Sequence, residues 1–314
     1  MSARFGVLSL RTVTAFPRAV TRTVPRPVLV APAAPSAWLP TAPCSPRTCV
    51  EASAPRTVVP RALLRFGTAL IVLIPGILLC RLVGRLPAGP RERLVRGWCR
   101  AVVRALGVRV RITGCAPPEG GLLLVAHHVS WLDIPLLAAV RPARMLAKRE
   151  VRGWPVAGAI TTRARTLFID RDRLRALPGT VAAISEALRA GSAVAAFPEG
   201  STWCGRARGH FRRAVFQAAL DAGVPVQPVR LNYRTALGAA STSPAFVGED
   251  SLLTSVWRVV TARGLVAEVE VRPPLAPGRL PDRRALARAA QQEAEGAPRP
   301  TPDDLPGSRL PSHP

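Results

Sequence analysis

The chain has 314 residues and is 48% hydrophobic, enough for one sizeable domain with a packed core and appended segments. Its formal net charge is +25, yet Lys148 is the only lysine among 44 basic residues. This bias toward arginine, with many Ala, Pro and Gly residues, indicates a GC-rich genome, so the charge is weak support for nucleic-acid binding. No zinc-finger spacing, RNA-binding aromatic signature or recognition helix is present, and we expect no nucleic-acid partner. A basic surface still attracts anionic lipid headgroups.

The six cysteines are scattered along the chain, and none forms a CxxC pair. They are Cys44, Cys49, Cys80, Cys99, Cys115 and Cys204. The sequence therefore predicts free thiols in a reducing compartment, without a disulfide framework and without a metal site.

Residues 1–55 are rich in Pro, Ala, Thr, Val and Arg, and Glu51 is their only acidic residue. They contain no uninterrupted apolar stretch before a cleavage site, which argues against a standard signal peptide. The arginine-rich, acid-poor composition also resembles a transit peptide. We favour a disordered N-terminal extension and leave open whether it belongs to the mature protein.

Residues 56–88 are predicted to form a membrane-anchor helix. Phe66 to Cys80 is an uncharged apolar run with arginines on both sides. Fifteen helical residues span about 22 Å, short of the roughly 30 Å hydrocarbon core, and Pro75-Gly76 would kink the helix. We therefore expect a membrane-embedded or re-entrant anchor rather than a helix that crosses the whole bilayer, and we expect the protein at the cytoplasmic face of the cell membrane. A buried core helix is the alternative.

Residues 89–272 are predicted to form one α/β domain, with a three-layer, mostly parallel sheet flanked by helices. An amphipathic helix over 90–107 leads into an alternating strand over 108–112. Apolar strands then alternate with helices, which is typical of such a sheet. We expect strands at 122–126, 166–169, 193–197, 226–231 and 266–271, and helices at 134–140, 173–190 and 211–222. Residues 273–314 are predicted to be a mobile tail, with a short helix around 282–295.

The run from His127 to Asp133 follows the strand over 122–126 and carries the first candidate site. Histidine moves protons near neutral pH, and an aspartate held nearby fixes its tautomer. His128 and Asp133 would lie roughly 140° apart on one continuous helix, so we expect His128 before the helix and Asp133 in its first turn. A base and its orienting acid without a nucleophile predict transfer onto a hydroxyl of the substrate. Ser130 and Asp133 could alternatively be a helix cap, and His127 is interpreted as a neighbour.

Three further patterns follow predicted strands. Phe168 to Arg171 ends in an acid and a base, Phe197 to Thr202 contains Glu199 and Gly200, and Val224 to Val229 is apolar. Polar clusters past the carboxyl ends of strands are where open α/β sheets bind ligands.

The four patterns, in this order over roughly residues 90–235, resemble the sequence blocks of the glycerolipid acyltransferase superfamily, which includes the 1-acylglycerol-3-phosphate (lysophosphatidate) acyltransferases. The resemblance implies that His128 is the general base for the acceptor hydroxyl and that Asp133 orients it. The hydroxyl would attack the thioester of acyl-CoA or acyl carrier protein directly, so no cofactor, metal or acyl-enzyme is implied.

The resemblance also implies the substrate-binding residues. Arg171 would hold the phosphate of the acceptor, since its planar fork suits that task. Glu199 and Gly200 would shape the acceptor pocket with Ser201 and Thr202, and the fourth block would contribute to the acyl side or the core. The alternatives without a role in substrate binding are a solvated charge run around Arg171, a surface carboxylate at Glu199 and a plain core strand in the fourth block. Lys148 either contacts substrate phosphate or is there by chance.

One departure from the family pattern concerns the acceptor. Many lysophosphatidate acyltransferases continue the third block as Glu-Gly-Thr-Arg-Ser, whereas here Glu199-Gly200 is followed by Ser, Thr and Trp. Arg206 and Arg208 could substitute for the missing arginine. The membrane lipid acceptor favoured is 1-acyl-sn-glycerol-3-phosphate, giving phosphatidic acid; lyso-ornithine lipid and other lysophospholipids are alternatives. A thioesterase and a catalytically silent membrane-binding protein are the remaining hypotheses.

Overall fold

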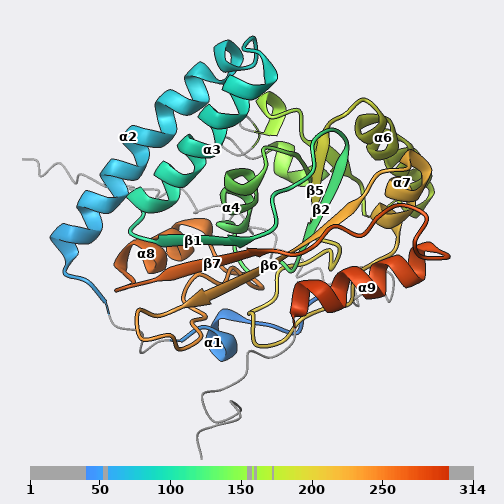
Figure 1. Cartoon of the computed structure of the whole chain (residues 1–314). Coiled ribbons are helices and arrows are strands. Elements are labelled where there is room, and N and C mark those ends of the chain that lie inside the picture. Colours follow the sequence, from blue (N-terminus) through green and yellow to red (C-terminus); the bar gives the residue numbers. More distant parts are fainter. Residues whose placement is uncertain (1–39, 52–55, 154–157, 159–160, 172, 297–314) are drawn as a thin grey trace, which may run out of the picture. The chain divides into compact units, whose positions relative to one another are not determined.

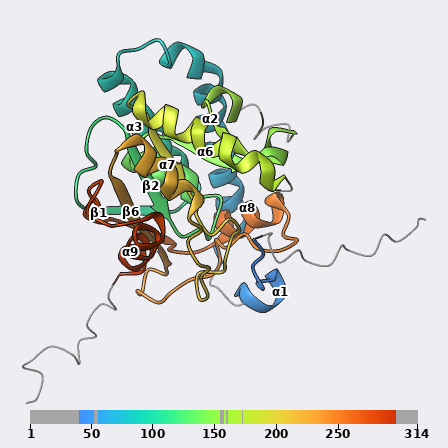
Figure 2. The ribbon, with the colours of Figure 1, turned by 90° about the vertical axis from the view of Figure 1, so that its right-hand side faces the viewer.

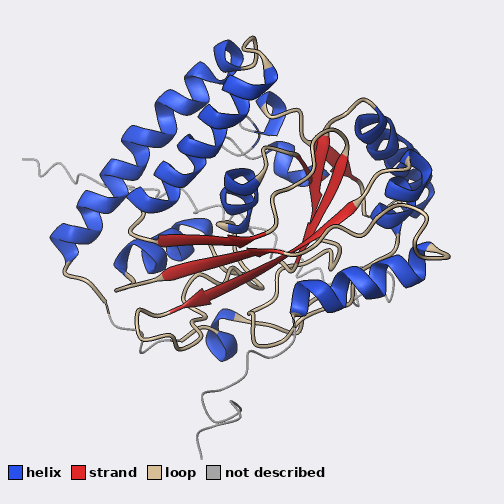
Figure 3. Ribbon diagram, in the orientation of Figure 1, coloured by secondary structure: helices blue, strands red, loops and turns tan. Residues whose placement is uncertain are grey.

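A computed structural model describes residues 40–51, 56–153, 158, 161–171 and 173–296. Seven strands form one sheet (Figure 3). They are β1 (Arg109–Gly114), β2 (Leu122–Ala126), β3 (Arg144–Lys148), β4 (Leu167–Ile169), β5 (Ala193–Ala196), β6 (Val226–Arg234) and β7 (Val266–Val271). Their order is β1-β7-β6-β2-β5-β3-β4, and every neighbouring pair is parallel except β6 with β7. The predicted mostly parallel α/β sheet is confirmed.

Helices cover both faces of this sheet (Figure 1). They are α1 (Pro46–Cys49), α2 (Val59–Val83), α3 (Ala88–Ala105), α4 (Asp133–Val140), α6 (Leu177–Arg189), α7 (Ala214–Ala222), α8 (Leu252–Thr261) and α9 (Arg283–Glu295). The core on one face is shared by α2, α3, α4 and α8, and the core on the other by α6, α7 and α9. Figure 2 shows α6 and α7 side by side. The arrangement is the predicted three layers.

The position of strand β2 in the sheet explains why residues 122–126 are apolar without interruption. Side chains of a strand alternate between the faces of a sheet. Leu122 and Leu124 enter the core beneath α4, whereas Leu123 and Val125 enter the core beneath α7. All four are fully buried, as expected for a central parallel strand that is covered on both faces.

Two elements were not predicted, and two lie in ranges assigned to tails. Strand β3 lacks alternation, whereas helix α8 (Leu252–Thr261) is amphipathic, with Ser255, Val259 and Val260 buried, and was overlooked. Helix α1 lies within the predicted extension 1–55, of which the structure describes residues 40–51. Helix α9 lies beyond the predicted domain end at 272, and its Leu286 and Ala290 are buried against β2 and β6. The packed part of the chain therefore continues through α9, which corrects the predicted boundary.

Helix α2 is longer than the apolar run that predicted it. Its 25 residues span about 37 Å, long and apolar enough to cross a membrane. Most of its surface is exposed, while one side packs on α3, where Trp98 Nε1 donates to the Val72 carbonyl at 2.9 Å. The Trp98 ring lies against Gly76, where a Cβ would collide with it. Gly76 therefore permits the close approach of α3, and the helix continues through Pro75.

Candidate active site

The functional side chains predicted from sequence gather at one edge of the sheet. Strands β2, β3, β4 and β5 are parallel, so their carboxyl ends meet at the same edge. His128 follows β2, Glu199 follows β5 and Arg171 follows β4. Lys148 is the last residue of β3 and pairs with Ile169 of β4. Segments far apart in sequence therefore contribute to a single region.

His128 and Asp133 form a direct pair. The Nδ1 atom of His128 lies 2.9 Å from Asp133 Oδ2, and the Asp133 side chain is fully buried. As expected, His128 precedes helix α4 and Asp133 is its first residue. The same carboxylate oxygen also accepts the backbone N–H groups of Val129 at 2.7 Å and Ser130 at 2.8 Å. Asp133 thus caps the turn and orients the histidine with one oxygen.

The second oxygen of Asp133 is held by Tyr233, which sequence reasoning missed. The Tyr233 hydroxyl donates to Asp133 Oδ1 at 2.5 Å. Burial, reinforced by the negative charge of Asp133, raises the pKa of Tyr233 well above its ordinary value, so the hydroxyl remains a donor. Two features could have drawn attention to Tyr233 in the sequence. It is the only tyrosine of the chain, and it shares a face of β6 with Leu231 and Val229.

The imidazole of His128 is fixed in the orientation that a base needs. A carboxylate only accepts hydrogen bonds, so Nδ1 carries the hydrogen and Nε2 has the free lone pair. The ring stacks on Phe197, with centroids 3.9 Å apart and planes inclined by 7°. The side chain keeps 20% of its surface exposed. Nε2 can therefore take a proton from a hydroxyl brought to this edge.

Glu199 is buried and supports both histidines. Its Oε2 accepts the backbone N–H of His128 at 2.7 Å. Its Oε1 accepts the N–H of Gly209 at 2.7 Å and lies 2.8 Å from His127 Nδ1. With its side chain fully buried, Glu199 is not a surface loop carboxylate, and it fixes the loop that carries His128. His127 faces Glu199, while His128 faces Asp133.

Arg171 and Gly200 contact each other across the strand ends. Nη1 of Arg171 donates to the Gly200 carbonyl. Burial lowers the pKa of Arg171 to about 10, so the guanidinium remains a cation at neutral pH. Among the residues that the structure describes, no carboxylate lies at ion-pair distance from it. Gly200 has a φ of +79°, and a Cβ there would lie 2.7 Å from Pro40 Cγ, so glycine is required.

The rest of the third block lies beside these residues. The backbone N–H of Trp203 donates to the His128 carbonyl at 2.7 Å. The Ser201 hydroxyl is buried and has no hydrogen-bond partner within the described part of the chain, and Thr202 is half-buried. Arg206 is exposed and pairs with Glu51 at 2.7 Å, whereas Arg208 is half-buried and burial lowers its pKa.

The fourth block is a core strand. Val226, Gln227 and Val229 are buried in β6, and the Pro225 carbonyl accepts the N–H of Leu123 from β2. The alternative of a plain core strand thus describes this block. The chemistry lies farther along the same strand, at Tyr233.

Comparisons with known proteins agree with this geometry. Residues 107–232 match the family model described as Acyltransferase. A lyso-ornithine lipid O-acyltransferase of Pseudomonas aeruginosa is 40% identical over 64% of this chain and 77% of that protein. A 1-acyl-sn-glycerol-3-phosphate acyltransferase of Neisseria meningitidis is 36% identical over 57% and 71%. The crystal structure of the 1-acyl-sn-glycerophosphate acyltransferase PlsC of Thermotoga maritima shares the fold, with a TM-score of 0.58 and 18% identity over 76% of this chain and 92% of that one.

Proposed function

The chain belongs to the acyltransferase family, and we propose that it moves a fatty acyl group from the thioester of acyl-CoA or acyl carrier protein to the free hydroxyl of a lysolipid. The observation that carries this proposal is the His128–Asp133 pair, with Nδ1 held and Nε2 free. No serine or cysteine nucleophile is part of the pair, which leaves that role to the acceptor.

The proposed transfer uses this pair as base and orienting acid. Nε2 of His128 takes the proton of the acceptor hydroxyl as its oxygen attacks the thioester carbonyl carbon. Asp133 stabilises the imidazolium that forms. The carbon–sulfur bond breaks, and the imidazolium returns its proton to the departing thiolate. General-base assistance of this kind contributes roughly 10²–10⁴-fold.

The favoured acceptor is 1-acyl-sn-glycerol-3-phosphate, which would become phosphatidic acid. Arg171 is a largely buried cation without an ion-pair partner in the described residues, and Lys148 and Arg149 lie at the neighbouring strand end. A buried charge costs free energy until it is paired, so a phosphate bound here would be favourable. Arg149 already contacts Asp170 at 3.0 Å, which leaves Arg171 as the principal phosphate ligand. Ser201 and Thr202 would contact the same acceptor.

Lyso-ornithine lipid is the second candidate acceptor, and two observations favour it. The arginine expected after Glu199-Gly200 is absent, and the relative from Pseudomonas aeruginosa that carries this name is 40% identical. The carboxylate of that lipid would also pair with Arg171. The chemistry at His128 is unchanged by this choice.

Association with membrane lipids is supported by α2. This helix is apolar, and large side chains on it remain exposed, among them Leu64, Ile71 and Leu78. Such a surface fits a bilayer, which also supplies the lysolipid. We assign the catalytic domain to the cytoplasmic face, where acyl-CoA and acyl carrier protein occur.

The test uses the full chain in detergent, with labelled oleoyl-CoA and oleoyl carrier protein as donors. Equimolar 1-acylglycerol-3-phosphate, lyso-ornithine lipid and lysophosphatidylcholine compete as acceptors. His128→Ala should lose at least about 10²-fold in kcat, whereas exposed His210→Ala should not change it. Full activity of His128→Ala would exclude the proposed base. Thioester hydrolysis without acceptor acylation would favour a thioesterase, and the absence of both reactions would favour a silent membrane-binding protein.

A further inference from the structure

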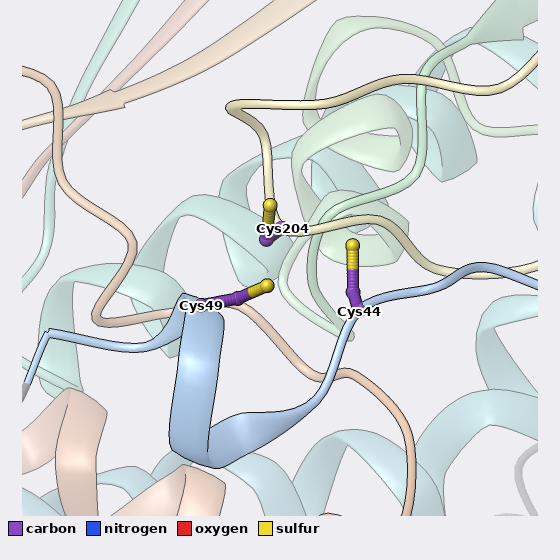
Figure 4. A group of neighbouring side chains, drawn as sticks. All are labelled: Cys44, Cys49 and Cys204. Carbon is purple, nitrogen blue, oxygen red and sulfur yellow. The ribbon is translucent and has the colours of Figure 1, made fainter.

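Three thiols meet where the N-terminal segment contacts the loop after β5 (Figure 4). The Sγ atoms of Cys44, Cys49 and Cys204 all lie within 4.8 Å of one another. Cys44 and Cys204 are buried and Cys49 is half-buried. The spacing of the cysteines gave no sign of this cluster because Cys204 is far along the chain. We propose that these three thiols bind one thiophilic metal ion, Zn²⁺ or Cu⁺.

The donor set determines the class of metal. Thiolate ligands select Cu⁺ and Zn²⁺ over the hard cations Mg²⁺ and Ca²⁺. With zinc–sulfur bonds of about 2.3 Å, tetrahedral coordination places the sulfur atoms roughly 3.8 Å apart. All three Sγ atoms already lie within 4.8 Å of one another, so this spacing requires displacements of only about 1 Å. Zn²⁺ would take water as its fourth ligand, whereas Cu⁺ needs only the three thiolates.

A disulfide explains the cluster less well. It would join sulfur atoms about 2.05 Å apart and would use only two of the three cysteines. All three are free thiols here. Metal binding needs no oxidant: each S–H bond is replaced by a metal–sulfur bond, and the proton leaves to solvent.

The chain positions the first two thiols through contacts that do not involve the metal. The Ser45 hydroxyl accepts the N–H of Thr48 at 3.3 Å, and the Ser45 carbonyl accepts the N–H of Cys49 at 3.0 Å. This turn holds Cys49 near Cys44, with the Sγ atoms of both within 4.8 Å of each other. The turn also packs closely on the segment that contains Gly248, whose φ is +59°. A Cβ at Gly248 would lie 3.1 Å from the Cys44 carbonyl oxygen.

The third thiol, Cys204, is positioned by contacts that its neighbours Trp203 and Arg206 make with other segments. Glu51 donates its N–H to the Thr242 hydroxyl at 3.0 Å and pairs with Arg206, two residues after Cys204. Trp203, the residue before Cys204, donates its N–H to the His128 carbonyl. A metal ion here would therefore tie the N-terminal segment to the loop that supports His128. Its role would be positioning, since none of the three thiols contacts the His128–Asp133 pair.

The binding test uses the reduced full chain in detergent, titrated with Zn²⁺ and, in a separate arm, with Cu⁺. Competition with chromophoric chelators gives affinity and stoichiometry, and Co²⁺ substitution reports thiolate ligation through its absorption bands. We expect one ion per chain in at least one arm, and an unfolding midpoint that rises with its concentration. The two arms decide which ion is preferred.

Cys44→Ser, Cys49→Ser and Cys204→Ser should each weaken binding at least tenfold and reduce the intensity of the thiolate bands. Exposed Cys115→Ser is the matched control and should bind as the wild type does. Cys49 is half-buried, so its variant remains informative if the others fail to fold. Absence of stoichiometric binding in both arms, or unchanged binding by Cys49→Ser, would overturn the proposal. A Cys44–Cys204 disulfide found by peptide mapping, without metal binding by the reduced chain, would overturn it as well.

Discussion

Tyr233 and His128 hold the two oxygens of one carboxylate: the tyrosine hydroxyl donates to Asp133 Oδ1 at 2.5 Å, and the imidazole contacts Oδ2 at 2.9 Å. Strand β6 neighbours β2, and Tyr233 lies on the face of β6 covered by α4, whose first residue is Asp133. The carboxylate is therefore fixed from two elements remote in sequence. Tyr233 is a positioning residue, which acts on the base through Asp133.

Replacement of Tyr233 by phenylalanine tests this role. The change removes the donor to Asp133 Oδ1 and should lower kcat about tenfold, since such a bond to a charged group contributes about 1.5 kcal/mol. The KM for the acyl donor should remain unchanged, because Tyr233 is buried and acts on the base through Asp133. Steady-state kinetics with both substrates varied separates the two parameters. A rise in KM alone would contradict the positioning role.

The raised pKa of Tyr233 predicts a specific alkaline loss of stability. Because the folded pKa lies above the unfolded value of about 10, its contribution is complete below pH 10 and is lost as pH rises through the folded pKa. The difference in unfolding free energy between wild type and Tyr233→Phe should therefore narrow above about pH 10. Since Tyr233 is the only tyrosine, tyrosinate absorbance reports its ionisation directly. A native titration midpoint near 10 would refute this expectation.

Glu199→Gln distinguishes support of the histidine loop from contact with the acceptor. The glutamine amide donates where Glu199 now accepts, so either His128 N–H or the Gly209 N–H loses its acceptor. We expect a loss of about 1–3 kcal/mol in unfolding free energy and a fall in kcat. Exposed Glu119→Gln is the control. Normal stability with a raised KM for the lysolipid would instead place Glu199 in the acceptor pocket.

The sequence predicted the sheet and most of the residues at its edge because both depend on local patterns. Apolar runs and their periods identify strands, and parallel strands place their carboxyl ends together whatever the loops between them do. Tyr233, α1 and the cysteine cluster depend on contacts across the fold, such as Cys204 with Cys44, which no spacing reveals. Strand β3 was missed because Arg144 to Lys148 lacks β-branched residues and alternation. Glu199 was identified, but its burial and its bond to the His128 backbone required the structure.

Arg171→Ala tests whether this guanidinium binds the phosphate of the favoured acceptor. Loss of a charged contact of about 1.5–3 kcal/mol corresponds to a roughly 10–100-fold rise in KM for 1-acylglycerol-3-phosphate. The KM for the thioester should not change. Arg171→Lys should recover activity only in part. An ammonium group lacks the several N–H donors with which a planar guanidinium can contact both Gly200 and a phosphate. Arg263→Ala, at an exposed arginine between α8 and β7, is the control. An unchanged KM for the phosphorylated acceptor would show that Arg171 does not bind it.

The exposed face of α2 should determine membrane binding. Ile71 and Leu78 are 72% and 70% exposed, and burial of one such side chain contributes about 1.5–3 kcal/mol. Ile71→Glu combined with Leu78→Glu should therefore lower partitioning onto phosphatidylglycerol-containing vesicles by at least about 100-fold, measured by flotation. The control is Leu237→Glu, which adds one of these two charges at a residue that is 97% exposed in the turn after β6 rather than on α2. Equal loss in both variants would indicate a general effect of added negative charge on a basic protein. Loss confined to the α2 variant, persisting at high salt, would identify the apolar face as the determinant, because salt screens charge but leaves apolar burial intact.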